Sequence, residues 1–145
     1  MVTVRPEDEQ VDAYSRSGIL ERMDEPTEKP LRWVASARGD LREFPAAVRR
    51  VMGTALYFAQ TGGKHPSAKP FKGVVRGSGV LEIVEDHGTS TFRTVYTVRF
   101  ARAVYVLHAF QKKSKKGIKT PQHDVDLIRA RFEIARRDYE AEFGS

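Results

Sequence analysis

The sequence contains no cysteine among its 145 residues, which excludes disulfides, thiolate zinc sites and cysteine nucleophiles. It also lacks an apolar run of about 18 residues, so no transmembrane helix is predicted. The N-terminus shows no apolar segment of the kind that begins a secretory signal. Its four histidines, His65, His87, His108 and His123, are not spaced like metal ligands. We therefore expect a cytoplasmic protein that needs no metal or other cofactor.

Charge is unevenly distributed along the chain, whose net charge is +6. Residues 1–30 carry a net charge of −4, and the remainder carries +10. We interpret residues 1–30 as an acidic N-terminal extension, flexible or folded into a short helix around Ile19–Met23. Residues 31–145 are then one basic domain, and its charge predicts a polyanionic partner such as nucleic acid.

Hydrophobic periodicity and turn residues predict seven elements in this domain. In chain order they are a strand at 31–35, a helix from 36 to 44, a helix from 45 to the Thr-Gly-Gly of 61–63, strands at 80–85, 91–100 and 103–112, and a helix beginning at Thr120-Pro121. Residues 64–79 form a Gly- and Lys-rich connector. The order β-α-α-β-β-β-α predicts an α+β fold, with an antiparallel sheet and helices packed on one of its faces.

The stretch 91–119 is the most informative part of the chain. Alternation along the first strand puts four residues on a core face, namely Phe92, Tyr96, Val98 and Phe100. Arg93 and Arg99 share the opposite face, where a guanidinium needs solvent or an anion. The second strand ends in five lysines within eight positions, Lys112, Lys113, Lys115, Lys116 and Lys119. This cationic end of the hairpin is the predicted location of function.

Several segments resemble one family of small proteins. They are Ala68–Gly73, Leu81–Ile83, Phe92–Tyr96, Val106–Ser114 and Lys119–Pro121. Together with the element order, they are similar to the RelE/ParE toxin superfamily, and in particular to its phage-derived, HigB-like branch. The resemblance covers roughly Leu31 to Tyr139.

The resemblance implies a type II toxin that cleaves messenger RNA, usually at the ribosome, and is neutralised by a cognate antitoxin. In this branch the antitoxin is usually a helix-turn-helix protein, and operator DNA is bound only through the toxin–antitoxin complex. The implied cleavage needs no metal, because the ribose 2′-hydroxyl attacks the adjacent phosphate. Two alternatives stay open: a ParE-like gyrase inhibitor, or an RNA-binding relative without nuclease activity.

The resemblance also assigns candidate roles to cationic residues. Arg93 matches an arginine that would stabilise the phosphoryl transition state. Lys72 is a candidate phosphate clamp or general base, and one of Lys112 and Lys113 is a candidate catalytic cation. The residues expected to bind RNA through its backbone are Lys69, Arg99, Lys115, Lys116 and Lys119. Each of these lysines could instead be a solvated surface residue.

Histidine and tyrosine suit acid–base chemistry, but His108 and Tyr139 are both interpreted as structural residues. His108 lies in an apolar strand and is expected to be a hydrogen-bonded core histidine. Tyr139 ends the apolar stripe of the last helix and is expected to pack against the sheet. His65, near the lysines of the connector, is left as a weak candidate for a base.

Overall fold

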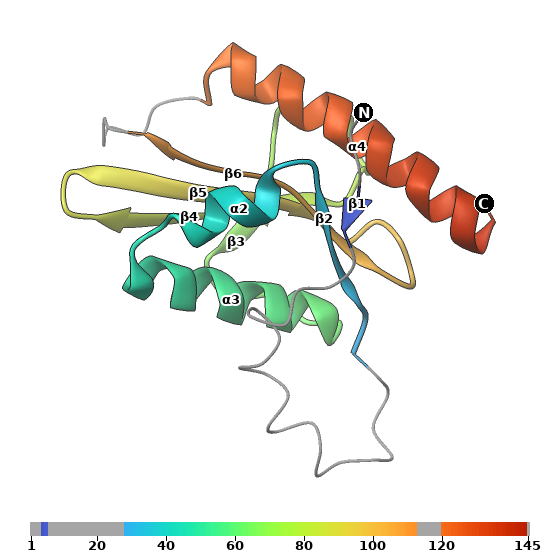
Figure 1. Cartoon of the computed structure of the whole chain (residues 1–145), viewed down its shortest axis with the longest axis horizontal. Coiled ribbons are helices and arrows are strands. Elements are labelled where there is room, and N and C mark those ends of the chain that lie inside the picture. The colour runs from blue at the N-terminus through green and yellow to red at the C-terminus, as the bar shows by residue number, and fades with distance from the viewer. Residues whose placement is uncertain (1–3, 6–27, 113–119, 145) are drawn as a thin grey trace, which may run out of the picture.

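The computed structural model describes residues 4–5, 28–112 and 120–144 (Figure 1). Its elements are β1 (Val4–Arg5), β2 (Leu31–Val34), α2 (Ala37–Arg42), α3 (Ala46–Gln60), β3 (Ala68–Pro70), β4 (Val80–His87), β5 (Ser90–Thr97), β6 (Val104–Lys112) and α4 (Gln122–Phe143). The seven predicted elements are all present. The structure adds the short strands β1 and β3, the latter inside the predicted connector.

The strands form one six-stranded sheet in the order β1-β2-β6-β5-β4-β3. The predicted meander of β4, β5 and β6 is confirmed, because each strand pairs antiparallel with the next. β2 pairs parallel with β6, so the sheet is mixed and not wholly antiparallel. The long connection between the two strands allows parallel pairing, because α2, α3 and the strands before β6 separate β2 from β6 along the chain.

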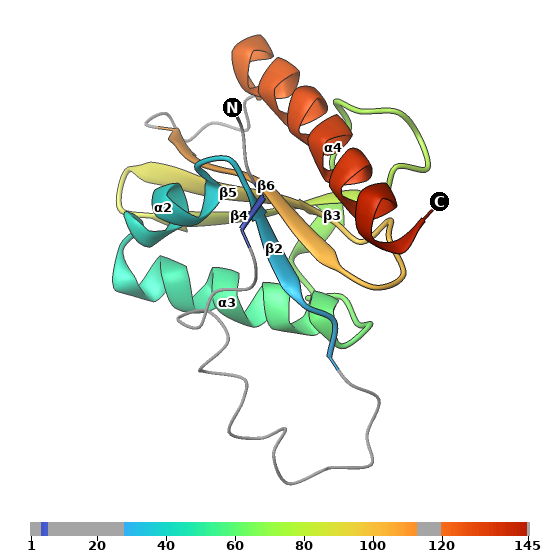
Figure 2. The ribbon, with the colours of Figure 1, turned by 45° about the vertical axis from the view of Figure 1, so that its right-hand side comes forward.

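The α+β fold class is confirmed, but the helices lie on both faces of the sheet and not on one (Figures 1 and 2). α2 and α3 cover one face through a core that includes Trp33, Met52 and Tyr96. α4 covers the other face through a second core that includes Tyr105 and Ile128. β6 is apolar on both sides along most of its length, which is typical of a strand buried between two layers.

A β-bulge interrupts the β5–β6 ladder near its middle. Val95 pairs with His108 but Tyr96 pairs with Val106, so Leu107 has no partner on β5. The extra residue lets Leu107 and His108 both lie on the side of α4. β5 itself ends at Thr97, which is why Phe100 packs under α4 and does not share a face with Phe92 as alternation predicted.

α4 begins one residue later than its sequence signal, because Pro121 and not Thr120 is the N-cap. The predicted apolar stripe is otherwise confirmed: Val125, Ile128, Ala135 and Tyr139 are buried against the sheet. The same stripe also buries Arg131, which the pattern alone did not indicate.

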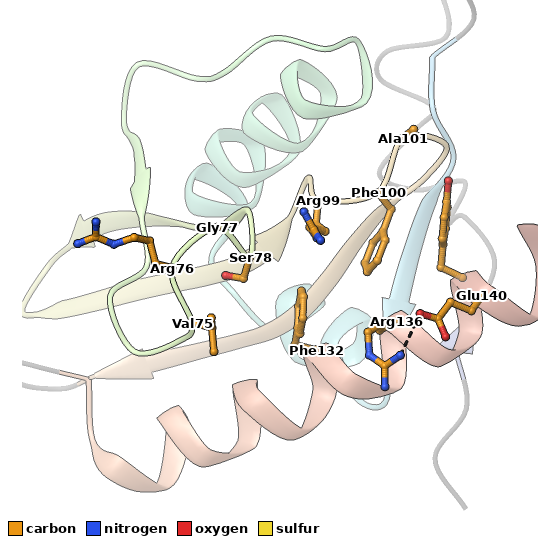
Figure 3. A pocket seen from close by; sticks show the side chains of 11 residues that line it. Val75, Arg76, Gly77, Ser78, Arg99, Phe100, Ala101, Phe132, Arg136 and Glu140 are labelled. Atoms are coloured by element: carbon orange, nitrogen blue, oxygen red, sulfur yellow. Dashed lines mark hydrogen bonds and ion pairs between the residues drawn. The ribbon is translucent and has the colours of Figure 1, made fainter. Parts of the chain in front are cut away.

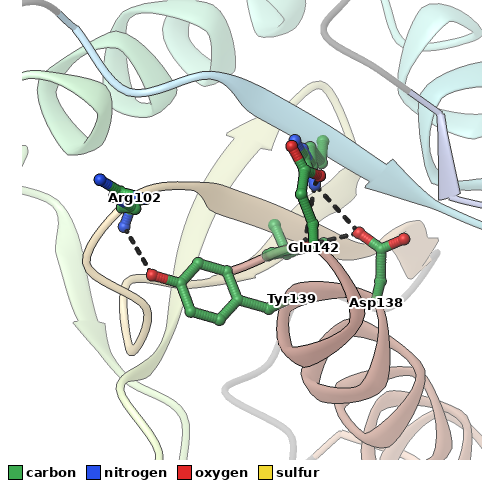
Figure 4. Close-up of polar contacts among 6 residues, drawn as sticks. Arg102, Asp138, Tyr139 and Glu142 are labelled. Carbon is green, nitrogen blue, oxygen red and sulfur yellow. Dashed lines mark hydrogen bonds and ion pairs between the residues drawn. The ribbon is translucent and has the colours of Figure 1, made fainter. Parts of the chain in front are cut away.

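Polar contacts anchor the C-terminal half of α4 (Figure 4). Arg32 on β2 forms ion pairs with Asp138 at 3.1 Å and with Glu142 at 2.6 Å. Tyr105 donates a 2.6 Å hydrogen bond to Asp138, and the hydroxyl of Tyr139 accepts one of 3.2 Å from the Arg102 backbone. The hydrogen bond from Arg32 lowers the pKa of Glu142. The predicted packing role of Tyr139 is therefore confirmed.

The predicted boundary at residue 30 stays a prediction. β1 pairs antiparallel with β2 and extends the sheet at that edge. Nearer the domain, the Lys29 amide donates a 2.8 Å hydrogen bond to Gln60 at the end of α3. The part of the extension between these two contacts lies outside the described residues.

Candidate functional site

A cleft of about 610 Å³ opens between the N-terminal half of α4 and the β3–β4 edge of the sheet. Its lining residues come from β3 and the loop after it, from β4 and β5, and from the start of α4. They are Lys69, Pro70, Phe71, Lys72, Gly73, Glu82, Arg93, Thr120, Gln122, Val125 and Arg129. The cleft thus collects side chains from four separate segments of the chain.

Glu82 lies between two of the cations of this cleft, Lys69 on β3 and Arg93 on β5. Lys69 is its direct cross-strand partner in the β3–β4 ladder, so their side chains lie on the same face. On the other side, Arg93 donates a hydrogen bond from a terminal guanidinium nitrogen to Glu82 Oε1 at 3.0 Å. The side chains of Arg93 and Glu82 are only 11% and 10% exposed. Each member of so poorly hydrated an ion pair depends on the other, because removing one charge leaves the remaining charge without compensation.

The cleft is held in shape by a contact between α4 and the loop after β3. Arg129 Nε donates a 2.7 Å hydrogen bond to the carbonyl of Gly73. A Cβ at Gly73 would lie 2.8 Å from the Phe71 ring and 3.0 Å from Val125. Only glycine therefore allows the loop to approach the helix this closely. The loop carrying Lys72 is consequently fixed against the first turns of α4.

The cleft can bind a phosphate and accept a proton. Two lysines and two arginines supply positive charge, and the N-terminal end of α4 adds the positive end of its helix dipole. A guanidinium has five N–H donors, so Arg93 can hold Glu82 and a phosphoryl oxygen together. Among the described residues that line the cleft, Glu82 is the only carboxylate.

The structure brings three of the predicted site residues, Arg93, Lys69 and Lys72, into this one cleft. Lys112 does not line it, although the pairing of Thr91 with Lys112 puts that lysine on the same face as Arg93. Arg99 follows the opposite end of β5 and lines a different pocket. The other predicted lysines, Lys113, Lys115, Lys116 and Lys119, lie outside the described residues.

Sequence reasoning missed Glu82 and Arg129. Glu82 could have been found, because it is an isolated acid between Leu81 and Ile83 in a strand paired with the one that carries Arg93. Arg129 gave no such signal. It is one of several arginines off the apolar stripe of α4, and only the packing of the loop after β3 gives it a partner.

His108 is a buried, hydrogen-bonded core histidine, as expected, with 6% of its surface exposed. Its Nε2 lies 2.8 Å from Asp124 and its Nδ1 lies 3.5 Å from Arg131. Arg131 also donates to the Leu107 carbonyl at 2.9 Å and to the Ser36 hydroxyl at 3.2 Å. Burial lowers the pKa of His108, so the ring is neutral at pH 7, donating from Nε2 and accepting at Nδ1.

The lowered pKa of His108 makes the stability of the fold depend on pH. Below about pH 6.5 the unfolded chain binds a proton at this ring that the folded chain does not. The free energy of unfolding should therefore be greatest above pH 6.5. As the pH falls below that value, it should decrease by up to about 1.4 kcal/mol per pH unit. Urea unfolding at pH 7.5, 6.5 and 5.5 measures this slope.

The His108→Gln variant should lose that slope, because glutamine keeps polar groups at the site but does not titrate. His87→Gln, at an exposed position, is the matched control and should keep the slope of the wild type. Equal slopes in the wild type and His108→Gln would show that His108 does not control this pH dependence.

The fold and the cleft define a class of protein: a small α+β domain with a cationic cleft suited to a polyanion. A sequence model of the phage-derived Gp49-like proteins (DUF891) matches residues 39–133, more than half of the chain, and the protein therefore belongs to that family. The family is RelE-like and is associated with the toxins of toxin–antitoxin systems, so membership implies an antitoxin partner.

Comparison with curated proteins found no match, and neither did comparison with solved structures. The toxin-like resemblance seen in the sequence is thus confirmed at the level of the family, and its HigB-like branch stays a prediction. Among the described residues, no helix combines the length and the apolar character needed to cross a membrane.

Proposed function

We propose that the protein is a HigB-like endoribonuclease toxin that cuts messenger RNA at the ribosome by attack of a 2′-hydroxyl, without a metal. The observation that carries this proposal is the convergence of Arg93, Glu82, Lys69 and Lys72 on one cleft. Such a reaction needs a group that takes a proton, a group that gives one, and positive charge for the phosphoryl oxygens. The proposal assigns each of the three to residues that line the cleft.

In the proposed reaction, Glu82 accepts the proton of the 2′-hydroxyl while its oxygen forms a bond to phosphorus. The guanidinium of Arg93 stabilises the charge on the non-bridging phosphoryl oxygens. The bond from phosphorus to the 5′-oxygen breaks, and Lys72 is the proposed donor of a proton to that leaving oxygen. Lys69 holds the adjacent backbone phosphate. The products are a 2′,3′-cyclic phosphate and a free 5′-hydroxyl.

The remaining partners follow from this proposal. The protein acts in the cytoplasm, and a cognate helix-turn-helix antitoxin neutralises it. It meets operator DNA only through the complex with that antitoxin. The lysines at 112–119 precede Thr120, a lining residue of the cleft, in the sequence, and they are proposed to hold RNA backbone or ribosomal RNA through their charge.

Sequencing of RNA 5′ ends after brief induction, with a ligation step selective for 5′-hydroxyls, tests the proposal. The wild type should produce new 5′-hydroxyl ends inside coding regions. Glu82→Gln should reduce their yield about a hundredfold or more, since an amide cannot accept the proton and a positioned base contributes about 10²–10⁴-fold.

Glu85→Gln is the matched control, because Glu85 lies on the same strand but does not line the cleft. It should cleave like the wild type. Growth arrest by the wild type without new RNA ends would instead favour a gyrase inhibitor similar to ParE. Full cleavage by Glu82→Gln would remove Glu82 from the proposed mechanism.

A further inference from the structure

A second pocket, of about 530 Å³, lies on the same side of the sheet as the cleft. It is formed by the loop between β3 and β4, by the turn between β5 and β6, and by the C-terminal half of α4 (Figure 3). Aromatic and cationic side chains dominate its lining, among them Phe100, Phe132, Tyr139, Arg76, Arg99 and Arg136. The proposed reaction uses none of these residues.

Three aromatic rings form a stack in this pocket. Phe100 lies between the other two, with its centroid 4.7 Å from that of Tyr139 and 6.0 Å from that of Phe132. The interplanar angles are 26° and 22°. Phe100 and Tyr139 are buried, whereas Phe132 is half-buried and lies between Phe100 and Val75 in the view of Figure 3. A flat apolar ring entering the pocket can extend the stack at Phe132.

Val75 lies on the other side of the position that a ring stacked on Phe132 would occupy. Its side chain is 80% exposed, which makes it the only large hydrophobic residue so exposed in the described part of the chain. It lies in the loop whose residues Val75–Ser78 line the pocket. An apolar side chain opposite Phe132 gives the entering ring a second surface to contact.

Positive charge surrounds the aromatic stack. Arg99 and Arg136 lie on opposite sides of the rings in Figure 3, and Arg76 lies on the adjoining loop. Arg136 is held by Glu133 at 2.7 Å and by Glu140 at 2.9 Å, while Arg76 and Arg99 are exposed. Three arginines and one acid, Glu140, line the pocket, so its charge favours an anion. A nucleotide joins a flat ring to an anionic phosphate, so it matches both features of the pocket.

The two pockets follow one another along two shared segments, α4 and the stretch from β3 to Ser78. On α4, Gln122, Val125 and Arg129 line the cleft, and the next residues of the same helical face, Phe132, Arg136 and Tyr139, line the second pocket. β3 and the start of the loop after it contribute residues 69–73 to the cleft, and the rest of that loop contributes 75–78 to the pocket. Arg129, which donates a hydrogen bond to the Gly73 carbonyl, is the last of the α4 residues that line the cleft before those that line the second pocket. One polynucleotide strand lying along α4 can therefore reach both.

We propose that the second pocket is a base-binding subsite, in which Phe132 stacks on a nucleobase of the RNA whose backbone is cut in the cleft. Arg76 and Arg99, the two exposed arginines of its lining, hold the phosphates beside that base. This inference rests on the proposed function, since it concerns the same RNA. Phe132 has a binding role here and takes no part in the reaction.

An abasic scan tests the inference. The probe is a fluorescent nine-residue RNA carrying 2′-O-methyl groups, which has no free 2′-hydroxyl to attack, and a series in which each base in turn is removed. Fluorescence anisotropy gives the affinity of each probe for the wild type and for Phe132→Leu. In the wild type, one abasic position should weaken binding about tenfold, within the range for stacking of a base on an aromatic ring.

In Phe132→Leu that penalty should disappear, because the base no longer has a ring to stack on. This is the signature of a direct contact in a double-mutant cycle. Phe143→Leu is the matched control, a half-buried aromatic on the same helix that does not line the pocket. It should keep the tenfold penalty. A thermal unfolding curve for each variant confirms that it is folded.

Three results would overturn the inference. The same abasic penalty in the wild type and Phe132→Leu, with cleavage intact, would remove the subsite and leave the endoribonuclease proposal standing. No binding of the nine-residue probe by the wild type, together with no cleavage, would remove both. Unchanged RNA binding by Phe132→Leu with weakened binding of the antitoxin would reassign the pocket to the protein partner.

Discussion

Replacing Arg93 by alanine is expected to slow RNA cleavage about a thousandfold and to abolish growth arrest on induction. The loss of one preorganised donor to a developing oxyanion costs about 10²–10³-fold, and a guanidinium that stabilises phosphoryl transfer contributes about 10³–10⁵-fold. Arg93 is 11% exposed and lies against Glu82, so its charge acts where water screens it poorly. Single-turnover cleavage of an RNA oligonucleotide, with and without ribosomes, measures the effect.

Loss of the fold has to be separated from loss of catalysis, because Arg93→Ala leaves the Glu82 carboxylate poorly hydrated and without its ion pair. The double variant Arg93→Ala with Glu82→Gln removes that uncompensated charge and should recover stability without recovering cleavage. Arg93→Lys should fall between the wild type and alanine, since lysine keeps the charge and loses the fork. Wild-type cleavage by a folded Arg93→Ala would exclude Arg93 from the reaction.

Replacing Ile128 by alanine is expected to lower the free energy of unfolding by about 3 kcal/mol, within the 2–5 kcal/mol typical of such changes in a core. Ile128 is 0% exposed and lies in the core between α4 and the sheet. Both pockets are bounded by α4, so the same change should also weaken RNA binding. Urea unfolding, followed by circular dichroism, gives the change in stability.

Leu127→Ala is the matched control, because Leu127 is the preceding residue of the helix and is only half-buried. It removes a similar volume and should cost about 1 kcal/mol, since less apolar surface leaves the core. Equal losses for the two variants would show that α4 is not held by the face assigned to it here.

Helix and strand assignments were predictable because each depends on residues close together in the chain. The spacing of Val125, Ile128 and Ala135 identifies a helical face, and the density of β-branched and aromatic residues from 91 to 112 identifies a hairpin. The strand β3, inside the predicted connector, was not predicted for the same reason. Three residues, Ala68–Pro70, form a strand only because β4 offers an edge with which to pair.

The candidate site was predicted in part. Arg93, Lys69 and Lys72 were identified from segments that resemble a toxin family, and all three line the cleft. Glu82 was not identified, because its position opposite Lys69 and diagonal to Arg93 depends on the register of three strands. Arg99 was expected to join Arg93 because alternation gives both residues one face, but it lines the second pocket at the far end of β5.

The sequence by itself determined the basic domain, the α+β class, the order of the main elements and the family-like segments that point to Arg93. These properties follow from composition, periodicity and local motifs. Only the tertiary structure decided that α4 covers the face opposite α2 and α3, that a carboxylate lies among the cations of the cleft, and that an aromatic pocket continues it. The physical reason is that burial and charge pairing are settled by strand register and by a bulge at Leu107, which join residues far apart in the chain.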